Sequence, residues 1–303
     1  MMSLFSLYKW TIVAGALAAP ALALLGVQLA TRDRAMQTLC VGQGAMVGVL
    51  AGIGFLHSFE GTPLGAIGPL GCAVLLSAIT IIATDRLVAG RMASRNTLFA
   101  FVFAFLLGAG SLVSAAFPAL ESHMAQVYFG DLATLTIFDS QVTSLVSLLC
   151  LTVLAVLAKS VSNQSFELAI FGNLVSSAGD RRGTWAFKII TLVMLSLSVQ
   201  FLGFLFTIAM LFLPTSLMSF VSSKGLKAHF ILCALVSIAS ALIGFVLSLN
   251  YTRLPTVPAI VMVMFLLSVV ILSGERLYRF VARAGEASRS LLDPQPITAT
   301  NGT

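Results

Sequence analysis

Charged residues are scarce in this chain. Only 9% of its 303 residues are Asp, Glu, Lys or Arg, whereas an ordinary soluble domain has roughly a quarter. Hydrophobic residues make up 58%, and no soluble fold of this length hides so much apolar surface from water. The shortage of charge therefore excludes a soluble protein and predicts an all-α, polytopic membrane helical bundle.

Three further absences narrow the function. The four cysteines form no CxxC pair and give no signal for a disulfide or a zinc motif. A GxxxxGK[ST] phosphate loop is missing, because residues 179–184 have Arg182 at the motif's Gly and Gly183 at its Lys. ATP would therefore have to be bound by another chain. No ionisable residue lies near the middle of a predicted span, which disfavours a secondary transporter.

The chain contains long runs of apolar residues. A crossing helix needs about 20 apolar residues. On this rule the predicted spans are 11–30, 39–56, 63–84, 97–117, 141–158, 184–203, 205–222, 229–249 and 256–273. Residues 184–222 are interrupted only around Gln200 and Gly203, so about nine spans are predicted if they form a hairpin, and eight if they cross once.

The basic residues favour the hairpin. With nine spans and an external N-terminus, fifteen of the 17 Lys and Arg residues fall in cytoplasmic segments, and only Lys9 and Arg253 lie outside. The inner residues are Arg32, Arg34, Arg86, Arg91, Arg95, Lys159, Arg181, Arg182, Lys188, Lys224, Lys227, Arg276, Arg279, Arg283 and Arg289. The C-terminus is therefore predicted to be cytoplasmic. Because this basic excess partitions with the membrane, it indicates contact with lipid and not with nucleic acid.

The chain divides into a transmembrane domain, residues 1–283, and a tail, residues 284–303, which is predicted to be disordered because it is polar and contains Pro294 and Pro296. The longest inner connection is 159–183. Within it, residues 165–173 (SFELAIFGN) have apolar side chains at helical spacing, which predicts a short amphipathic helix at the inner surface. This helix either lies on the membrane without a partner or docks a cytosolic protein.

Small residues are concentrated in the second span, where five glycines follow one another at short spacing. These are Gly42, Gly44, Gly48, Gly52 and Gly54. Such spacing lets helix backbones approach closely, so the glycines either line a narrow translocation path or hold the bundle together. Pro214 lies within the seventh span, where a proline kinks a helix or frees a carbonyl.

Several segments, in this order, resemble the membrane permeases of ABC-type zinc, manganese and iron importers. Residues 128–136 (YFGDLATLT) are similar to that family's FGDLLAVT-type segment, and residues 165–169 (SFELA) with Gly172 are similar to its cytoplasmic FDPELA…G stretch. Residues 202–219 (LGFLFTIAMLFLPTSLMS) are similar to its VGxLLxxxLLxxPAAxA pattern, and Pro255 and Pro258 keep the spacing of its TPxGP turn. The resemblance covers most of residues 20–275.

The resemblance implies a dimerising permease, with itself or with a second permease, in a bacterial cytoplasmic (inner) membrane. It implies a cytosolic ATP-binding subunit and an extracytoplasmic substrate-binding protein as partners, with no covalent chemistry and no cofactor on this chain. It places ATPase coupling on Phe166, Glu167, Leu168, Ala169 and Gly172. The translocation path is expected along Cys40, Gln43, Gly44, Gly48 and Pro214.

The chain departs from the family at its metal ligands. Where the family has a GD…H set on the second span, this chain has Thr38, Leu39 and Gln43, and Arg253 replaces an Asp before the TPxGP turn. Divalent cations prefer carboxylate and imidazole ligands. The predicted cargo is zinc or manganese, with a chelated metal, another solute, or a non-transporting partner subunit as alternatives. A speculative metal site lies on the predicted outer face: His57, Glu60, Glu121, His123 and Asp131.

Overall fold

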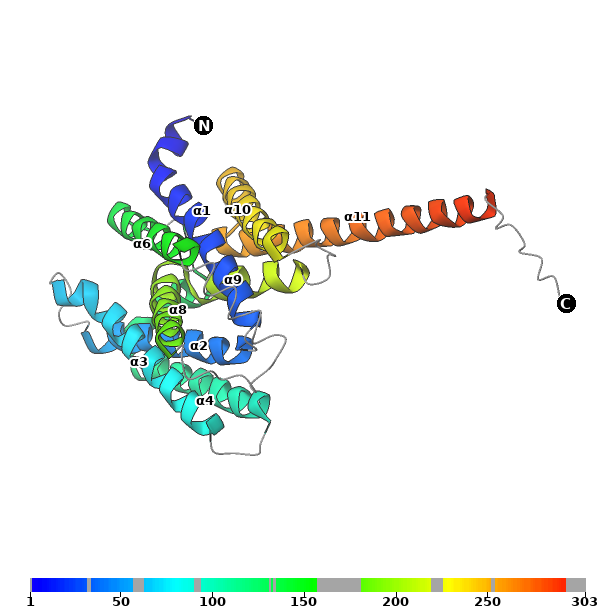
Figure 1. Cartoon of the computed structure of the whole chain (residues 1–303). Helices are drawn as coiled ribbons and strands as arrows, with labels where there is room; N and C mark the ends of the chain where they lie inside the picture. Colours follow the sequence, from blue (N-terminus) through cyan, green and yellow to red (C-terminus); the bar gives the residue numbers. More distant parts are fainter. Residues whose placement is uncertain are drawn as a thin grey trace.

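The computed structural model describes residues 2–31, 34–56, 63–89, 94–130, 132, 135–156, 181–218, 226–251 and 254–292, and within these ranges its regular structure is helical throughout (Figure 1). The elements are α1 (Met2–Thr31), α2 (Ala35–Leu56), α3 (Pro63–Ala89), α4 (Arg95–Ala116), η2 (Pro118–Leu120), α5 (Glu121–Phe129), α6 (Ile137–Val156), α8 (Arg181–Leu202), α9 (Phe204–Met218), α10 (Leu226–Asn250) and α11 (Thr256–Leu292). The predicted all-helical bundle is therefore confirmed for the described residues.

Seven of the described helices are long and apolar enough to cross a membrane, and two shorter apolar helices, Phe187–Leu202 and Phe204–Ser216, lie at the sixth and seventh predicted spans. Each predicted span coincides with one helix. The number of crossings and the side on which each terminus lies stay predictions.

The helices pack mainly around two apolar cores, and a smaller third cluster joins Val27 of α1 to Cys233 and Val236 of α10. The larger core joins α1, α6, α9, α10 and α11, and the smaller one joins α2, α3, α4 and α5. Helix α8 contributes to both, with Met194 in the larger core and Val199 in the smaller. Within the most hydropathic windows, 72% of α1 and 67% of α2 are buried, against 17% of α4. Helices α1 and α2 are therefore central, and α8 lies between the two groups.

The chain bends sharply between α8 and α9 at Gly203, which has φ +87°. The hydroxyl oxygens of Ser198 and Thr207 are 2.7 Å apart, whereas residues nine apart in one straight helix are separated by roughly 13 Å along its axis. A single continuous helix over 184–222 is therefore excluded, and the predicted interruption is found at Gly203.

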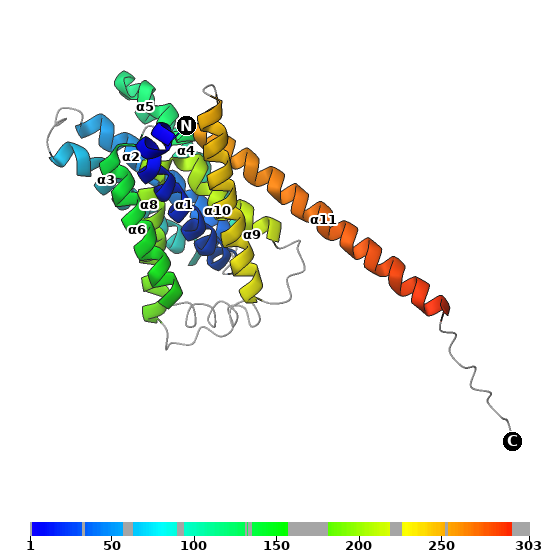
Figure 2. The same ribbon diagram turned by 90° about the horizontal axis from the view of Figure 1, so that it is seen from above.

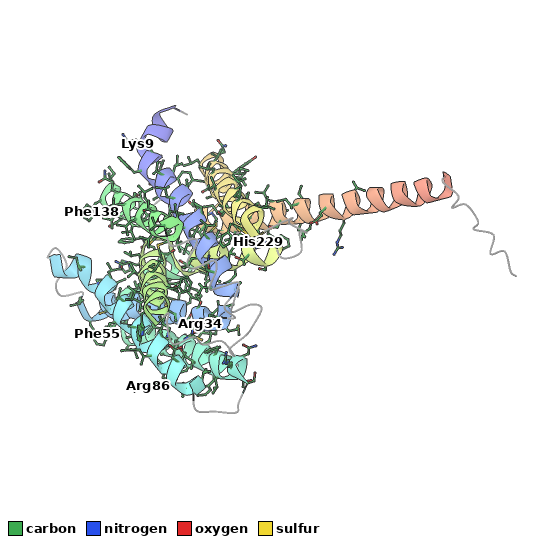
Figure 3. All side chains as sticks on the ribbon, in the orientation of Figure 1. Lys9, Arg34, Phe55, Arg86, Phe138 and His229 are labelled. Atoms are coloured by element: carbon green, nitrogen blue, oxygen red, sulfur yellow. The ribbon has the colours of Figure 1, made fainter. Side chains whose placement is uncertain are left out.

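The outer surface of the bundle is apolar. On α4, Phe101, Phe105 and Leu112 are 69%, 67% and 73% exposed, and Phe55 and Phe138, labelled in Figure 3, are 70% and 72% exposed. Such a surface is costly in water and favourable in lipid. The exposed side chains agree with a bundle surrounded by hydrocarbon.

Helix α11 extends beyond the bundle. In Figure 2, α5 and the start of α1 lie at the upper end of the bundle, and α11 runs from that end diagonally away from the bundle towards the lower right. The helix continues through residues 284–292, the first nine residues of the predicted disordered tail, so the predicted boundary at 284 does not coincide with the end of α11. Residues 293–303 lie outside the described part.

Candidate functional site

Helix α2 carries four of the five residues predicted to line a translocation path. Cys40, Gln43, Gly44 and Gly48 are all buried. The Cys40 thiol donates a hydrogen bond of 3.1 Å to the carbonyl oxygen of Phe99 on α4, so this side of α2 packs against α4. The four residues therefore do not share one open surface.

The glycines of α2 contact α3. A Cβ atom at Gly48 would lie 2.6 Å from the Cα of Ala73, and one at Gly52 would lie 2.6 Å from the Cα of Pro69. At Gly44 it would lie 2.5 Å from the hydroxyl oxygen of Thr80. We call Gly44, Gly48 and Gly52 the glycine seam. Of the two readings of these glycines, the geometry favours close packing of the bundle over the lining of a path.

Gln43 is different from its neighbours on α2. Its side chain is fully buried, and neither the amide oxygen nor the amide nitrogen has a hydrogen-bond partner among the described residues. Burial raises the pKa of the Tyr128 hydroxyl on α5, and the nearby Gln43 amide opposes that rise. A buried, unsatisfied amide costs stability. Gln43 therefore places hydrogen-bonding groups inside the bundle that the described residues leave unsatisfied.

Two segments that carry the family resemblance meet at a crossing of backbones. Gly130 has φ +72°, and a Cβ on it would lie 1.9 Å from the carbonyl oxygen of Leu202. A Cβ on Gly203 would lie 2.4 Å from the Cα of Gly130. Only glycine fits both the positive φ and the close approach. Next to the crossing, the amide oxygen of Gln200 is buried, and no group in the described part of the chain bonds to it.

Pro214 lies inside α9 and is buried. Its carbonyl oxygen accepts a 3.6 Å hydrogen bond from the Cys233 thiol on α10. One turn earlier, a Cβ on Gly26 of α1 would lie 1.8 Å from the carbonyl oxygen of Leu211. The structure therefore places Pro214 at the packing of α9 against α1 and α10, and its role in a path stays a prediction.

The predicted outer metal site is only partly described. His57, Glu60 and Asp131 lie outside the described residues, and Glu121 is described only as the first residue of α5. His123 is exposed and lines a cavity of about 140 Å³. The other lining residues are Ile53, Gly54, Ala116, Phe117, Pro118 and Leu120. Within the described ranges no three His, Cys, Asp or Glu residues are grouped to hold a metal.

The predicted ATPase-coupling residues, Phe166, Glu167, Leu168, Ala169 and Gly172, also lie outside the described residues. Helix α8 begins at Arg181, within the last residues of the predicted inner connection 159–183. Any movement of that connection would therefore reach α8 directly.

A polar cluster joins the ends of α2, α3 and α8. Lys188 Nζ donates to Asp85 Oδ2 at 2.5 Å, and Gln37 Nε2 donates to Asp85 Oδ1 at 2.9 Å. Arg34 pairs with Asp85 Oδ1 at 3.9 Å and donates to Gln37 Oε1 at 3.3 Å. Gln37 Nε2 also reaches the hydroxyl of Thr84 at 3.0 Å. We call these five residues the inner polar cluster, because three predicted inner segments meet there.

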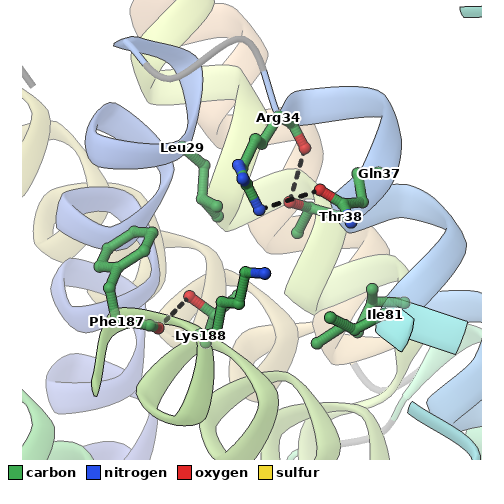
Figure 4. Close-up of a pocket in the computed structure, with 9 residues that line it drawn as sticks. Leu29, Arg34, Gln37, Thr38, Ile81, Phe187 and Lys188 are labelled. Carbon is green, nitrogen blue, oxygen red and sulfur yellow. Dashed lines mark hydrogen bonds between the residues drawn. The ribbon is translucent and has the colours of Figure 1, made fainter. Parts of the chain in front are cut away.

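Sequence reasoning missed the role of this cluster. It counted Arg34 and Lys188 only as inner-side charges and gave no role to Gln37 or Asp85. The available signal was an acid, Asp85, at the end of a long apolar run and among basic residues. Next to the cluster lies a cavity of about 30 Å³ (Figure 4). It is lined by Leu29, Arg34, Gln37, Thr38, Val41, Ile81, Phe187, Lys188 and Thr191.

Comparison with known proteins gives a match to a family and matches to solved structures. A model of the ABC 3 transport family matches residues 5–274. The fold is similar to PsaBC from Streptococcus pneumoniae in complex with Fab, with a TM-score of 0.71 and 14% identity over 92% of this chain and 99% of that one. It is also similar to a metal-chelate type ABC transporter in an inward-facing conformation, with a TM-score of 0.58 and 16% identity over 90% of this chain and 88% of that one. No curated protein matches the chain.

Proposed function

Because the chain belongs to the ABC 3 transport family, we propose that it is the membrane permease subunit of an ATP-driven importer of metal ions. The observation that carries this proposal is the extent of the family match, which reaches from α1 into α11. The similarity in fold to PsaBC over nearly the whole chain supports it. The chain itself performs no covalent chemistry in this account.

The proposed assembly contains a cytosolic ATP-binding subunit, an extracytoplasmic binding protein and a second permease copy or homologue in a bacterial inner membrane. We place the N-terminus outside and the C-terminus inside, with nine crossings. The positive charges at the predicted inner ends support this orientation. The meeting of Arg34, Asp85 and Lys188 in one cluster also supports it, because it brings three predicted inner segments together at one end.

The proposed cargo is zinc or manganese, as the resemblance implies. A chelated metal is the second candidate. One observation favours it: the fully buried Gln43 side chain on α2 is a neutral amide. A neutral amide and hydroxyl groups hold a bare divalent ion poorly, but they can hydrogen-bond the organic shell of a chelate.

Copurification tests the assembly. The tagged chain should bring down an ATP-hydrolysing subunit from its own cells, and Glu167→Lys should weaken that association by reversing a charge in the predicted coupling segment. Glu286→Lys makes the same change on α11, outside the predicted coupling segment, and should have no effect. If no ATP-hydrolysing protein accompanies the wild-type chain, the permease proposal is wrong.

A further inference from the structure

The inner polar cluster is a point at which two groups of helices are tied together by side chains. Asp85 lies near the end of α3. One of its carboxylate oxygens accepts a hydrogen bond from Lys188 of α8, and the other accepts one from Gln37 of α2. Arg34, just before α2, approaches the same carboxylate at 3.9 Å. The group thus holds α8 against the α2–α3 pair at one end of the bundle.

The cavity beside this group is very small. It is a partly open hollow, and its accessible volume of about 30 Å³ admits water. Arg34, Gln37 and Lys188 line it (Figure 4) together with Thr191, which is 6% exposed. While the cluster is intact, its side chains narrow the space where α1, α2, α3 and α8 converge to this small hollow.

The ion pairs of the inner polar cluster are weak enough to break and re-form. The Lys188 and Asp85 side chains are 20% and 35% exposed, and that of Arg34 is 35% exposed. Ion pairs that are partly exposed contribute little net stability, because water competes for both partners. Opening this end does not require a buried charge to be stripped of its partner, which would be far more costly.

Lys188 is also close along the chain to the segment proposed to contact the ATPase. It lies seven residues, about two helical turns, after the start of α8 at Arg181. A helix transmits a displacement of its first turn along its axis, so movement of the 159–183 connection would act on Lys188 directly.

We propose that Asp85 is a latch that closes the cytoplasmic end of the translocation path by holding Lys188 of α8 and Gln37 of α2, and that ATPase movement opens it through α8. This rests on the proposed function for its driving force, but closure by the latch does not depend on it. Asp85 acts as a positioning residue and need not contact the cargo.

Labelling of a single introduced thiol tests the latch. Thr191→Cys places the thiol at the small cavity, and a charged methanethiosulfonate reagent is added to the protein in nanodiscs, with the rate for the parent chain subtracted. Adding Asp85→Asn or Lys188→Gln should speed labelling by about two- to fivefold, since losing a partly exposed ion pair shifts an opening equilibrium by a factor of that size. The double variant should be no faster than the faster single one, because both remove one contact.

Arg86→Gln is the matched control. Arg86 is the exposed neighbour of Asp85 on α3, so its substitution changes the charge at the same depth without touching the cluster, and the labelling rate should stay the same. Equal labelling rates with and without Asp85→Asn would overturn the proposal that Asp85 is a latch. The use of two independent variants guards against one that fails to fold.

The proposal that ATPase movement opens the latch is tested separately, with the copurified ATPase. ATP should speed labelling in the Thr191→Cys chain and add nothing further when Asp85→Asn is present. A rate that depends on Asp85 but not on ATP would overturn control of the latch by the ATPase. If no ATPase copurifies, the proposed function fails, and the labelling comparison on the chain alone still decides whether Asp85 closes this end.

Discussion

The glycine seam between α2 and α3 is made of backbone, whereas the inner polar cluster at one end of the same two helices is made of charged and amide side chains. At the seam, atoms of the two helices approach so closely that a single added methyl group would overlap Ala73 or Pro69. At the cluster, α8 joins the pair through side chains that are partly exposed. The seam suits a joint that stays closed, and the cluster suits one that opens.

The backbone crossing at Gly130 and Gly203 is similar to the glycine seam, because there too the two segments touch without a side chain between them. The crossing lies at the end of α8, which takes part in both apolar cores. Near its start, α8 packs into the larger core through Phe187 and joins Asp85 through Lys188. The comparison therefore predicts that substitutions at glycine contacts damage the fold, and that substitutions in the cluster alter opening.

The largest loss of stability is expected from Gly203→Ala. Its φ of +87° is unfavourable for alanine, and the new Cβ would lie 2.4 Å from the Cα of Gly130. Together these should lower the free energy of unfolding by about 3 kcal/mol, measured by thermal unfolding in detergent. Gly108→Ala on α4, where a Cβ meets nothing within 4 Å, is the control. A stable Gly203→Ala protein would show that the crossing is not rigid.

Gly48→Ala should cause the next largest loss of stability. Its Cβ would lie 2.6 Å from the carbonyl oxygen of Cys72 and from the Cα of Ala73, so α2 and α3 must separate, at a cost of about 2 kcal/mol. Gly71→Ala on α3 is the matched control, because nothing lies within 4 Å of that position, and it should leave the unfolding temperature unchanged or slightly higher. Similar losses in both variants would argue against a special role for the seam.

Gln43→Leu should change stability in the opposite direction. Replacing an unsatisfied buried amide with an apolar side chain of similar size should raise stability by about 1 kcal/mol, while ATP-dependent metal uptake should fall because the proposed path loses a hydrogen-bonding group. Gln28→Leu on α1 is the contrasting control, since Gln28 is buried but has an interaction partner, and it should lose stability. Uptake that survives Gln43→Leu would remove Gln43 from the path.

Asp85→Asn should have the smallest effect on stability. The ion pairs it removes are partly exposed, so the free energy of unfolding should change by less than about 1 kcal/mol. Thermal unfolding of this variant beside Arg86→Gln checks the difference. A loss as large as that of Gly48→Ala would make the inner polar cluster a structural joint and not a movable one.

The sequence predicted the helices well because run length and charge are local signals. Every predicted span has its helix, and the interruption near Gly203 was expected from one glycine in a long apolar run. The short helix α5, and the continuation of α11 past residue 284, were not predicted, since neither carries a long apolar run.

The site was predicted less well because its contacts are distant in sequence. The pairing of Asp85 with Lys188 joins residues 103 apart, and no periodic pattern indicates it. Gly44 and Gly48 were expected either to line a path or to pack the bundle, and only the position of α3 separates these readings. The coupling residues 166–172 and most of the outer metal site stay predictions, since they lie outside the described residues.

The most direct test of the account is ATP-dependent uptake in liposomes that contain the chain with its copurified ATPase. Zinc, manganese and a chelated metal should be supplied separately, with the binding protein present. The account predicts that at least one of them accumulates when ATP is hydrolysed and that none does without ATP. An ATPase that turns over with no accumulation of any metal would contradict the assignment of this chain as a metal importer's permease.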